Sequence, residues 1–241
     1  MTTDTAQIAS LSAHFTSLQN AFLDNPYPSI HSRIAILKKL RSRIVELEEE
    51  LISAVSKDFG YRTAFDTLLG DILPTVQGLS HIIKKLPKWS KPSKRSVGLS
   101  LWPSKVSVTY QPKGVVGVIA PWNYPIQLAV VPVITAIAAG NKVMLKLSEF
   151  TPHTNAVLEK LFDDKMSQHV CVVQGGSNVA SEFSSLPFAH LLFTGSTGVG
   201  KLVMKAASKN LTPVTLELGG KSPVIITCLL YTSDAADESV S

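Results

Sequence analysis

Five short β-rich runs alternate with helix-length segments from Gly114 onward, and this alternation constrains the fold more than any other feature. The runs are VVGVIA (115–120), KVMLKL (142–147), VCVVQG (170–175), HLLFTG (190–195) and PVTLELG (213–219). They begin about 20 to 28 residues apart, a spacing typical of β–α units that build a parallel sheet covered on both faces. The chain is therefore predicted to be α/β, a Rossmann-like parallel sheet with flanking helices, whose ligands bind where the strands end.

Before Gly114 the apolar residues follow a helical period. One amphipathic helix is predicted from Ile34, Leu37, Leu40, Ile44, Leu47, Leu51 and Val55, which recur every three or four positions. A second helical stretch is expected from about Ala64 to Lys85, and KVSVTYQ (105–111) alternates like a half-exposed strand. We expect an N-terminal helical region with a basic connector over 1–104, a separate strand over 105–113 and the α/β domain over 114–227.

Composition excludes several classes of protein. With 45% hydrophobic and 17% charged residues, the chain can build a core and is not disordered. The net charge of +5 comes largely from KKLPKWSKPSKR (84–95), whose prolines favour a solvated connector over a nucleic-acid surface. The apolar run from Pro125 to Gly140 is shorter than a membrane span and is predicted to be a buried helix. Two cysteines fit a reducing compartment, so a cytoplasmic location without membrane or nucleic-acid partners is expected.

The segment FTGSTGVGKL (193–202) ends a β-run and opens a helix, where free N–H groups can bind a phosphate. Gly195, Gly200 and Lys201 match the phosphate loop of nucleotide triphosphatases, but Leu202 replaces the hydroxyl residue that would hold magnesium. A dinucleotide site is the second interpretation, although the spacing departs from the usual G-x-G-x-x-G. A purely structural turn is the third. The loop alone does not decide among them.

Four motifs at the ends of four of the five runs distinguish these interpretations when they are taken together. APWNYP (120–125), LKLSE (145–149), FTGSTGVG (193–200) and LELGGKSP (216–223) occur in this order. In order and wording they resemble the NAD(P)-dependent aldehyde dehydrogenase superfamily, and the upstream segments resemble most the coniferyl aldehyde dehydrogenase branch, near the class 3 enzymes. The resemblance covers roughly residues 30–226, close to the first half of a family member. It implies NAD as cofactor, with NADP as the alternative, and oxidation of an aromatic or long-chain aldehyde to the acid.

The resemblance also assigns catalytic roles. Asn123 matches the asparagine whose amide stabilises the oxyanion of a thiohemiacetal, the adduct of a cysteine thiolate and the aldehyde. In the family's reaction, transfer of hydride from this adduct to the nicotinamide leaves a thioester. Glu217 matches the base that activates water to hydrolyse that thioester. Because Glu217 stands between Leu216 and Leu218, its carboxyl is expected to be partly desolvated and its pKa raised. No metal is expected, since the histidines show no ligand spacing.

The cofactor residues are assigned in the same way. Lys146 and Glu149 match the pair that binds the adenosine ribose, and a carboxylate there favours NAD over NADP. Leu147 stands where the family usually has proline. Trp122 matches a residue of the cofactor cleft, and Leu218 is grouped with the cofactor-binding residues. The pyrophosphate turn is matched by Gly195, Ser196, Thr197, Gly198, Val199 and Gly200.

The nucleophile is the remaining question. The resemblance places the catalytic cysteine near position 250, beyond Ser241, and Cys171 lies within a β-run where a buried apolar role is expected. Cys228 opens CLLYTSDAADESVS (228–241), which resembles a translated sequencing adapter and is interpreted as an artefactual tail. The chain as given is therefore expected not to reduce NAD, and a non-catalytic dinucleotide-binding module stays open as the alternative. The strand over 105–113 resembles the arm that joins two copies of the family enzyme, which implies a homodimer.

Overall fold

The structure, a computed structural model, describes residues 3–163 and 166–223 of the chain. At its centre is a five-stranded parallel sheet with the strand order β5–β4–β3–β6–β7. The strands are β3 (Val115–Ile119), β4 (Lys142–Lys146), β5 (Val170–Val173), β6 (His190–Gly195) and β7 (Val214–Leu218). Each strand lies inside one of the five predicted runs, so the predicted α/β fold with a parallel sheet is confirmed.

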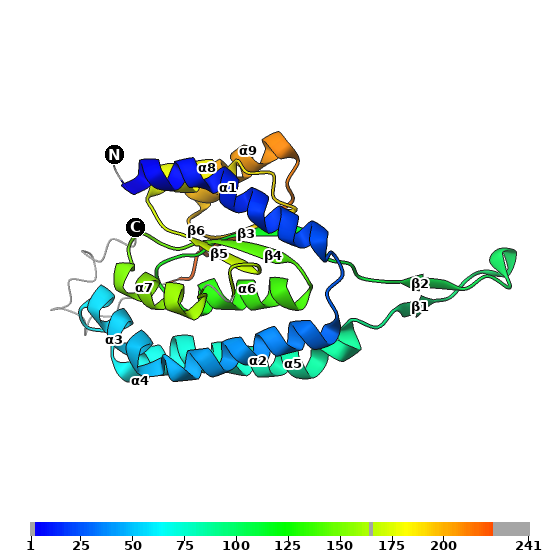
Figure 1. The fold of residues 1–241 in the computed structure, drawn as a ribbon, viewed down its shortest axis with the longest axis horizontal. Helices are drawn as coiled ribbons and strands as arrows, with labels where there is room; N and C mark the ends of the chain where they lie inside the picture. Colours follow the sequence, from blue (N-terminus) through cyan, green and yellow to red (C-terminus); the bar gives the residue numbers. More distant parts are fainter. Residues whose placement is uncertain (1–2, 164–165, 224–241) are drawn as a thin grey trace.

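Helices cover both faces of this sheet (Figure 1). One face carries α6 (Gln127–Ala138) and α7 (Pro152–Leu161), and the other carries α1 (Thr3–Asp24), α8 (Ser177–Ser184) and α9 (Thr197–Ala207). From β3 the chain builds outward through β4 to β5, and it then returns to the other side of β3 for β6 and β7. The strand order therefore reverses beside β3, and such a reversal opens a ligand crevice at the carboxyl ends of the strands.

A further layer of helices packs outside α6 and α7 (Figure 1). It consists of α2 (Ile30–Glu46), α3 (Glu48–Phe59), α4 (Ala64–Thr67), the π-helical turn η1 (Leu68–Ile72) and α5 (Leu73–Trp89). Its buried leucines and isoleucines share one hydrophobic core with α6, α7 and the sheet. The predicted second helix is confirmed and continues to Trp89, past Pro87, into the segment predicted to be a connector.

The prediction of a single helix from Ile34 to Val55 was wrong. The helix breaks at Leu47, whose backbone lies at φ −96° and ψ 7°. Three glutamates, Glu48 to Glu50, occupy the first turn of α3, where carboxylates interact favourably with the helix dipole. The break lets α2 pack on α5 while α3 packs on α7.

Helix α1 was not singled out by the sequence, yet it covers the sheet. Leu11, Phe15 and Leu18 are buried in a second core with β3, α8 and α9. Their spacing of four and three residues makes the apolar stripe of an amphipathic helix. Helix α1 thus lies on the opposite face of the sheet from α2 to α5 (Figure 1).

A two-stranded antiparallel hairpin projects from the body (Figure 1). Its strands are β1 (Ser93–Arg95) and β2 (Val106–Val108), with a short 3-10 turn η2 (Leu99–Leu101) between them. The predicted strand over 105–111 is thus shorter and fully exposed, and its partner β1 comes from the predicted connector. A second 3-10 turn, η4 (Ser208–Asn210), precedes β7.

Candidate functional site

The predicted site residues gather at the carboxyl end of the sheet because the strands are parallel and in register. Ile119 at the end of β3 pairs with Lys146 of β4 on one side and Phe193 of β6 on the other. Thr194 and Gly195 of β6 pair in turn with Glu217 and Leu218 of β7. The loops that follow these strands therefore emerge side by side, with the Asn123 loop between Lys146 and the glycine loop.

The loop after β3 carries Trp122, Asn123 and Tyr124 with their side chains exposed. Trp122 lies beside Phe59 of α3, with 6.1 Å between the ring centroids. Together with Tyr61, these rings line a cavity of about 570 Å³ that also contains Asn123. Arg62 and Asp66 line the same cavity, so the Asn123 amide shares it with aromatic rings and with charged groups.

The loop after β4 contains an ion pair between Lys146 and Glu149. Lys146 Nζ donates a hydrogen bond to Glu149 Oε2 at 2.9 Å, and the lysine side chain is buried. Burial is the largest single effect and opposes ionisation of Glu149. The hydrogen bond from Lys146, a backbone hydrogen bond at Glu149 and the charge of Lys146 together outweigh it and hold the pKa of that carboxyl below its ordinary value. At Leu147 the N–H donates to the carbonyl of Val173, a hydrogen bond that proline could not form.

The loop after β6 ends in the N-terminus of α9. Ser196 is the N-cap residue, and its hydroxyl accepts from the N–H of Val199 at 3.4 Å. A side chain at Gly195 would overlap the ring of Phe193, and one at Gly200 would overlap Leu218. Gly198 instead faces open space, and none of the three glycines has a positive φ. A turn that requires left-handed glycine is therefore excluded here, and the first turn of α9 is open to a ligand.

Glu217 is exposed, which contradicts the expected desolvation of its carboxyl. The physical reason is its place on β7, which is the outermost strand on its side of the described sheet. Leu218 is also exposed, at 40% of its surface. The apolar residues beside Glu217 in the sequence therefore do not screen it from solvent.

Three aspartates from the N-terminal region, for which no role was predicted from the sequence, bind the N-termini of the helices around this site. Asp71 accepts from the N–H groups of Ile126 and Gln127 at the start of α6. Asp58 accepts from His153 and Thr154 at the start of α7, and Asp4 accepts from Gly176 at the start of α8. The N-cap residues of these helices make no side-chain cap of their own. For Asp71 a sequence signal existed, since it shares the buried helical stripe with Thr75 and Leu79.

Cys171 is the cysteine within the described residues, and its position in β5 does not suit a nucleophile. Burial raises the pKa of its thiol to about 11, so the thiol stays protonated at neutral pH. Cys228 and the segment 228–241 lie outside the described residues. In the described part of the chain no group of three or more histidine, cysteine or acidic side chains could hold a metal ion.

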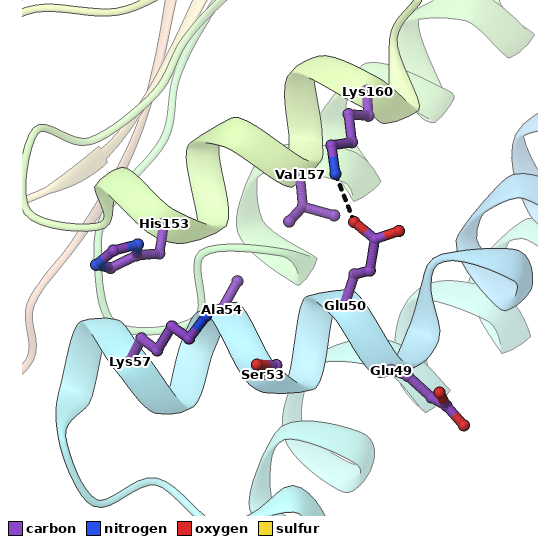
Figure 2. A pocket seen from close by; sticks show the side chains of 8 residues that line it. All are labelled: Glu49, Glu50, Ser53, Ala54, Lys57, His153, Val157 and Lys160. Carbon is purple, nitrogen blue, oxygen red and sulfur yellow. Dashed lines mark hydrogen bonds and ion pairs between the residues drawn. The ribbon is translucent and has the colours of Figure 1, made fainter.

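A separate pocket of about 390 Å³ lies between α3 and α7 (Figure 2). Lys160 Nζ donates to Glu50 Oε2 across it at 2.6 Å, and both side chains are more than half exposed. Exposed pairs of this kind contribute little stability. His153 and Lys57 also line the pocket, but none of the predicted site residues does.

The sequence profile described as the Aldehyde dehydrogenase family matches residues 5–240. The match is wider than the resemblance over residues 30–226, and it includes most of the segment 228–241. A probable coniferyl aldehyde dehydrogenase of Pseudomonas aeruginosa is 47% identical over 232 residues, 96% of this chain and 49% of the relative. The chain thus spans about half the length of this curated relative.

Two solved structures resemble the fold described above. The substrate-bound state of Staphylococcus aureus AldH has a TM-score of 0.84 and 36% identity, over 88% of this chain and 46% of the other. PnpE in complex with nicotinamide adenine dinucleotide has a TM-score of 0.77 and 28% identity, over 89% of this chain and 44% of the other. No helix in the described ranges is long and apolar enough to cross a membrane. The profile match over nearly the whole chain and the 47% identity show that this chain belongs to the aldehyde dehydrogenase family.

Proposed function

We propose that this chain is the cofactor-binding part of an NAD-dependent aldehyde dehydrogenase that oxidises aromatic aldehydes. The proposal depends on one observation. The Asn123 loop and the Lys146–Glu149 ion pair lie next to each other at the carboxyl end of the sheet. The name of the Pseudomonas aeruginosa relative, a probable coniferyl aldehyde dehydrogenase, supports an aromatic substrate. The rings that line part of the cavity around Asn123, beside Arg62 and Asp66, offer surfaces on which an aromatic substrate could stack.

The described residues fit a dinucleotide. Glu149 offers ionised carboxylate oxygens that accept hydrogen bonds from ribose hydroxyls, and Lys146 holds that carboxylate in place. The first turn of α9, open beside Gly198, offers backbone N–H groups to a pyrophosphate. When bound, NAD supplies the hydride acceptor of the reaction. Asn123 would donate a hydrogen bond to the oxygen of the aldehyde adduct, and the exposed Glu217 would accept a proton from water.

Titration of the chain with NAD+ and NADP+ tests the cofactor proposal. We expect NAD+ to bind more tightly, and Glu149→Gln to reduce this preference about ten-fold, because the lost charge no longer favours ribose hydroxyls or repels a 2′-phosphate. Isothermal titration calorimetry on the wild type and the variant measures the preference. Glu46→Gln, an exposed substitution at the end of α2, is the matched control. If the folded wild-type chain does not bind NAD+, the cofactor proposal is wrong.

A non-catalytic dinucleotide-binding module is the second candidate. It stays a candidate because the described residues offer no thiolate nucleophile: Cys171, the cysteine among them, is half-buried and protonated. Both candidates bind the cofactor, and only oxidation of an aldehyde separates them.

The two cysteines of the chain also support a cytoplasmic location, which we include in the proposal.

We further propose that the β1–β2 hairpin joins two copies of the protein. At its tip Leu99 is 96% exposed and Trp102 is 77% exposed, and large apolar side chains gathered on one exposed segment are typical of an interaction site. We expect the double substitution Leu99→Ser, Trp102→Ser to weaken self-association, as measured by sedimentation equilibrium. A wild-type chain that sediments as a monomer at all accessible concentrations would contradict this arrangement.

A further inference from the structure

Asp71 lies at the contact between the N-terminal helices and the loop that carries Asn123. It is fully buried in the π-helical turn η1. Its Oδ1 accepts from the N–H of Ile126 at 3.2 Å and from the N–H of Gln127 at 2.8 Å. Since α6 begins at Gln127, the carboxylate replaces the missing local cap of this helix.

Two neighbours of Asp71 hold the same loop from other directions. The ring of Tyr124 lies against Gly70, where an added Cβ would stand 2.7 Å from Tyr124 Cε1. The guanidinium of Arg62 lies 3.9 Å from the ring centroid of Phe59 and 5.2 Å from that of Tyr124. Arg62 Nη1 is also 3.6 Å from Asp71 Oδ2, close enough for an ion pair but outside hydrogen-bond distance.

The loop is therefore fixed at both ends. On one side the sheet holds Ile119, and the N–H of Ala120 donates to the carbonyl of Lys146 at 3.0 Å. On the other side Asp71 holds Ile126, three residues after Asn123. The side chains on either side of Asn123 contact the N-terminal helices, Trp122 at Phe59 and Tyr124 at Gly70. The conformation of the loop thus depends on groups outside the α/β domain.

We propose that Asp71, with Gly70 and Arg62, positions the Asn123 amide by anchoring the loop between β3 and α6. The inference rests on the proposed function, in which Asn123 contacts the reacting oxygen. Asp71 does not line the cavity with Asn123 and acts through the backbone, so it is a positioning residue. An oxyanion donor must be held in place before the reaction to be effective, and a carboxylate bound to the start of the following helix provides this constraint.

The test uses the 241-residue chain with Trp89→Phe and Trp102→Phe, which leaves Trp122 as the only tryptophan. Amide hydrogen exchange by NMR reports on Ile126 and Gln127, and Trp122 emission with the Asn123 side-chain amide resonance reports on the loop. Asp71→Ala is expected to accelerate exchange at the two amides about ten- to a hundred-fold, because a hydrogen bond to an ionised group is lost. Asp71→Asn keeps an oxygen acceptor and is expected to retain most of the protection.

Matched variants separate positioning from general stability. Asp4→Ala removes the same kind of contact from α8 and is expected to leave the Ile126 and Gln127 amides unchanged. Gly70→Ala is expected to displace Tyr124, to shift Trp122 emission to longer wavelength and to move the Asn123 resonance. Gly78→Ala, whose added methyl group meets nothing within 4 Å, should change neither signal.

Unchanged exchange of the two amides in Asp71→Ala would overturn the proposal. If that variant does not fold, Gly70→Ala decides alone, and identical signals in Gly70→Ala and Gly78→Ala would overturn it. These readouts need neither cofactor nor aldehyde. If the chain fails to bind NAD+ while the amide exchange, the Trp122 emission and the Asn123 resonance change as expected, the result therefore counts against the proposed function and not against the positioning role.

Discussion

Replacing Asn123 by alanine is expected to lower the rate of aldehyde oxidation about a hundred- to a thousand-fold, which corresponds to about 3 to 4 kcal/mol of transition-state stabilisation. The physical reason is that, in the proposed function, the variant loses the amide donor that would bind the oxygen on which negative charge develops. The measurement is NADH formation from an aromatic aldehyde at saturating NAD+, by a protein that joins this chain to the remainder of its relatives' length.

The control is Asn210→Ala. The side chain of Asn210 donates to the carbonyl of Ser185 and lies outside the predicted site. Both variants should bind NAD+ with the affinity of the wild type, so that a change confined to kcat is attributed to the donor. An unchanged rate in Asn123→Ala would exclude the proposed role, and a wild-type protein that binds NAD+ without oxidising aldehydes would favour the non-catalytic module.

The free energy of unfolding is expected to fall by about 3 kcal/mol, relative to Asp71→Asn, as the pH rises from about 4 to about 7. Burial raises the pKa of Asp71 to about 6 from an ordinary 3.8, against the opposing effects of the hydrogen bond from Gln127, the charge of Arg62 and the hydrogen bond from Ile126. Two pKa units correspond to about 3 kcal/mol. Between these pKa values the folded chain keeps a proton that the unfolded chain has lost, so this contribution is complete below pH 4 and is lost through pH 6.

Urea denaturation of the wild type and of Asp71→Asn across this pH range measures the difference between their free energies of unfolding. Ionisable groups other than Asp71 contribute equally to both proteins and cancel in this difference. Arg62 is the charged group that acts on Asp71, through the ion pair described above. The flanking helices carry Asp66 in α4, and His81 with three lysines in α5. Helix α6 has no ionisable side chain. A difference in unfolding free energy that is independent of pH would contradict the buried ionisation.

At neutral pH the ionised Asp71 lowers the stability of the fold, and this loss is relevant to the role proposed for it. Buried groups with shifted pKa values cluster at functional sites. Here the carboxylate lies directly behind the loop of Asn123. The stability measurement and the positioning test therefore examine two consequences of the same contact.

The five strands could be predicted from the sequence because each is a short apolar run between helix-length segments, and burial on both faces of a parallel sheet requires such runs. The loops of the candidate site followed from this, since the carboxyl ends of parallel strands lie together. The wording of four motifs, from APWNYP to LELGGKSP, indicated the family, and the comparisons confirmed it. The roles of Asn123, Lys146, Glu149 and Glu217 stay predictions.

Only the tertiary structure decided which surfaces and distant residues meet. The apolar neighbours of Glu217 suggested a desolvated carboxyl, but β7 is the outermost described strand on its side, so Glu217 is exposed. Asp71 and Ile126 are 55 positions apart, and Asp4 and Gly176 are 172 positions apart. Local periodicity reports which face of a helix is buried, but it does not report which helix terminus a buried carboxylate will meet. That pairing is set by the packing of the N-terminal helices on the sheet, and it determines how the loop of Asn123 is held.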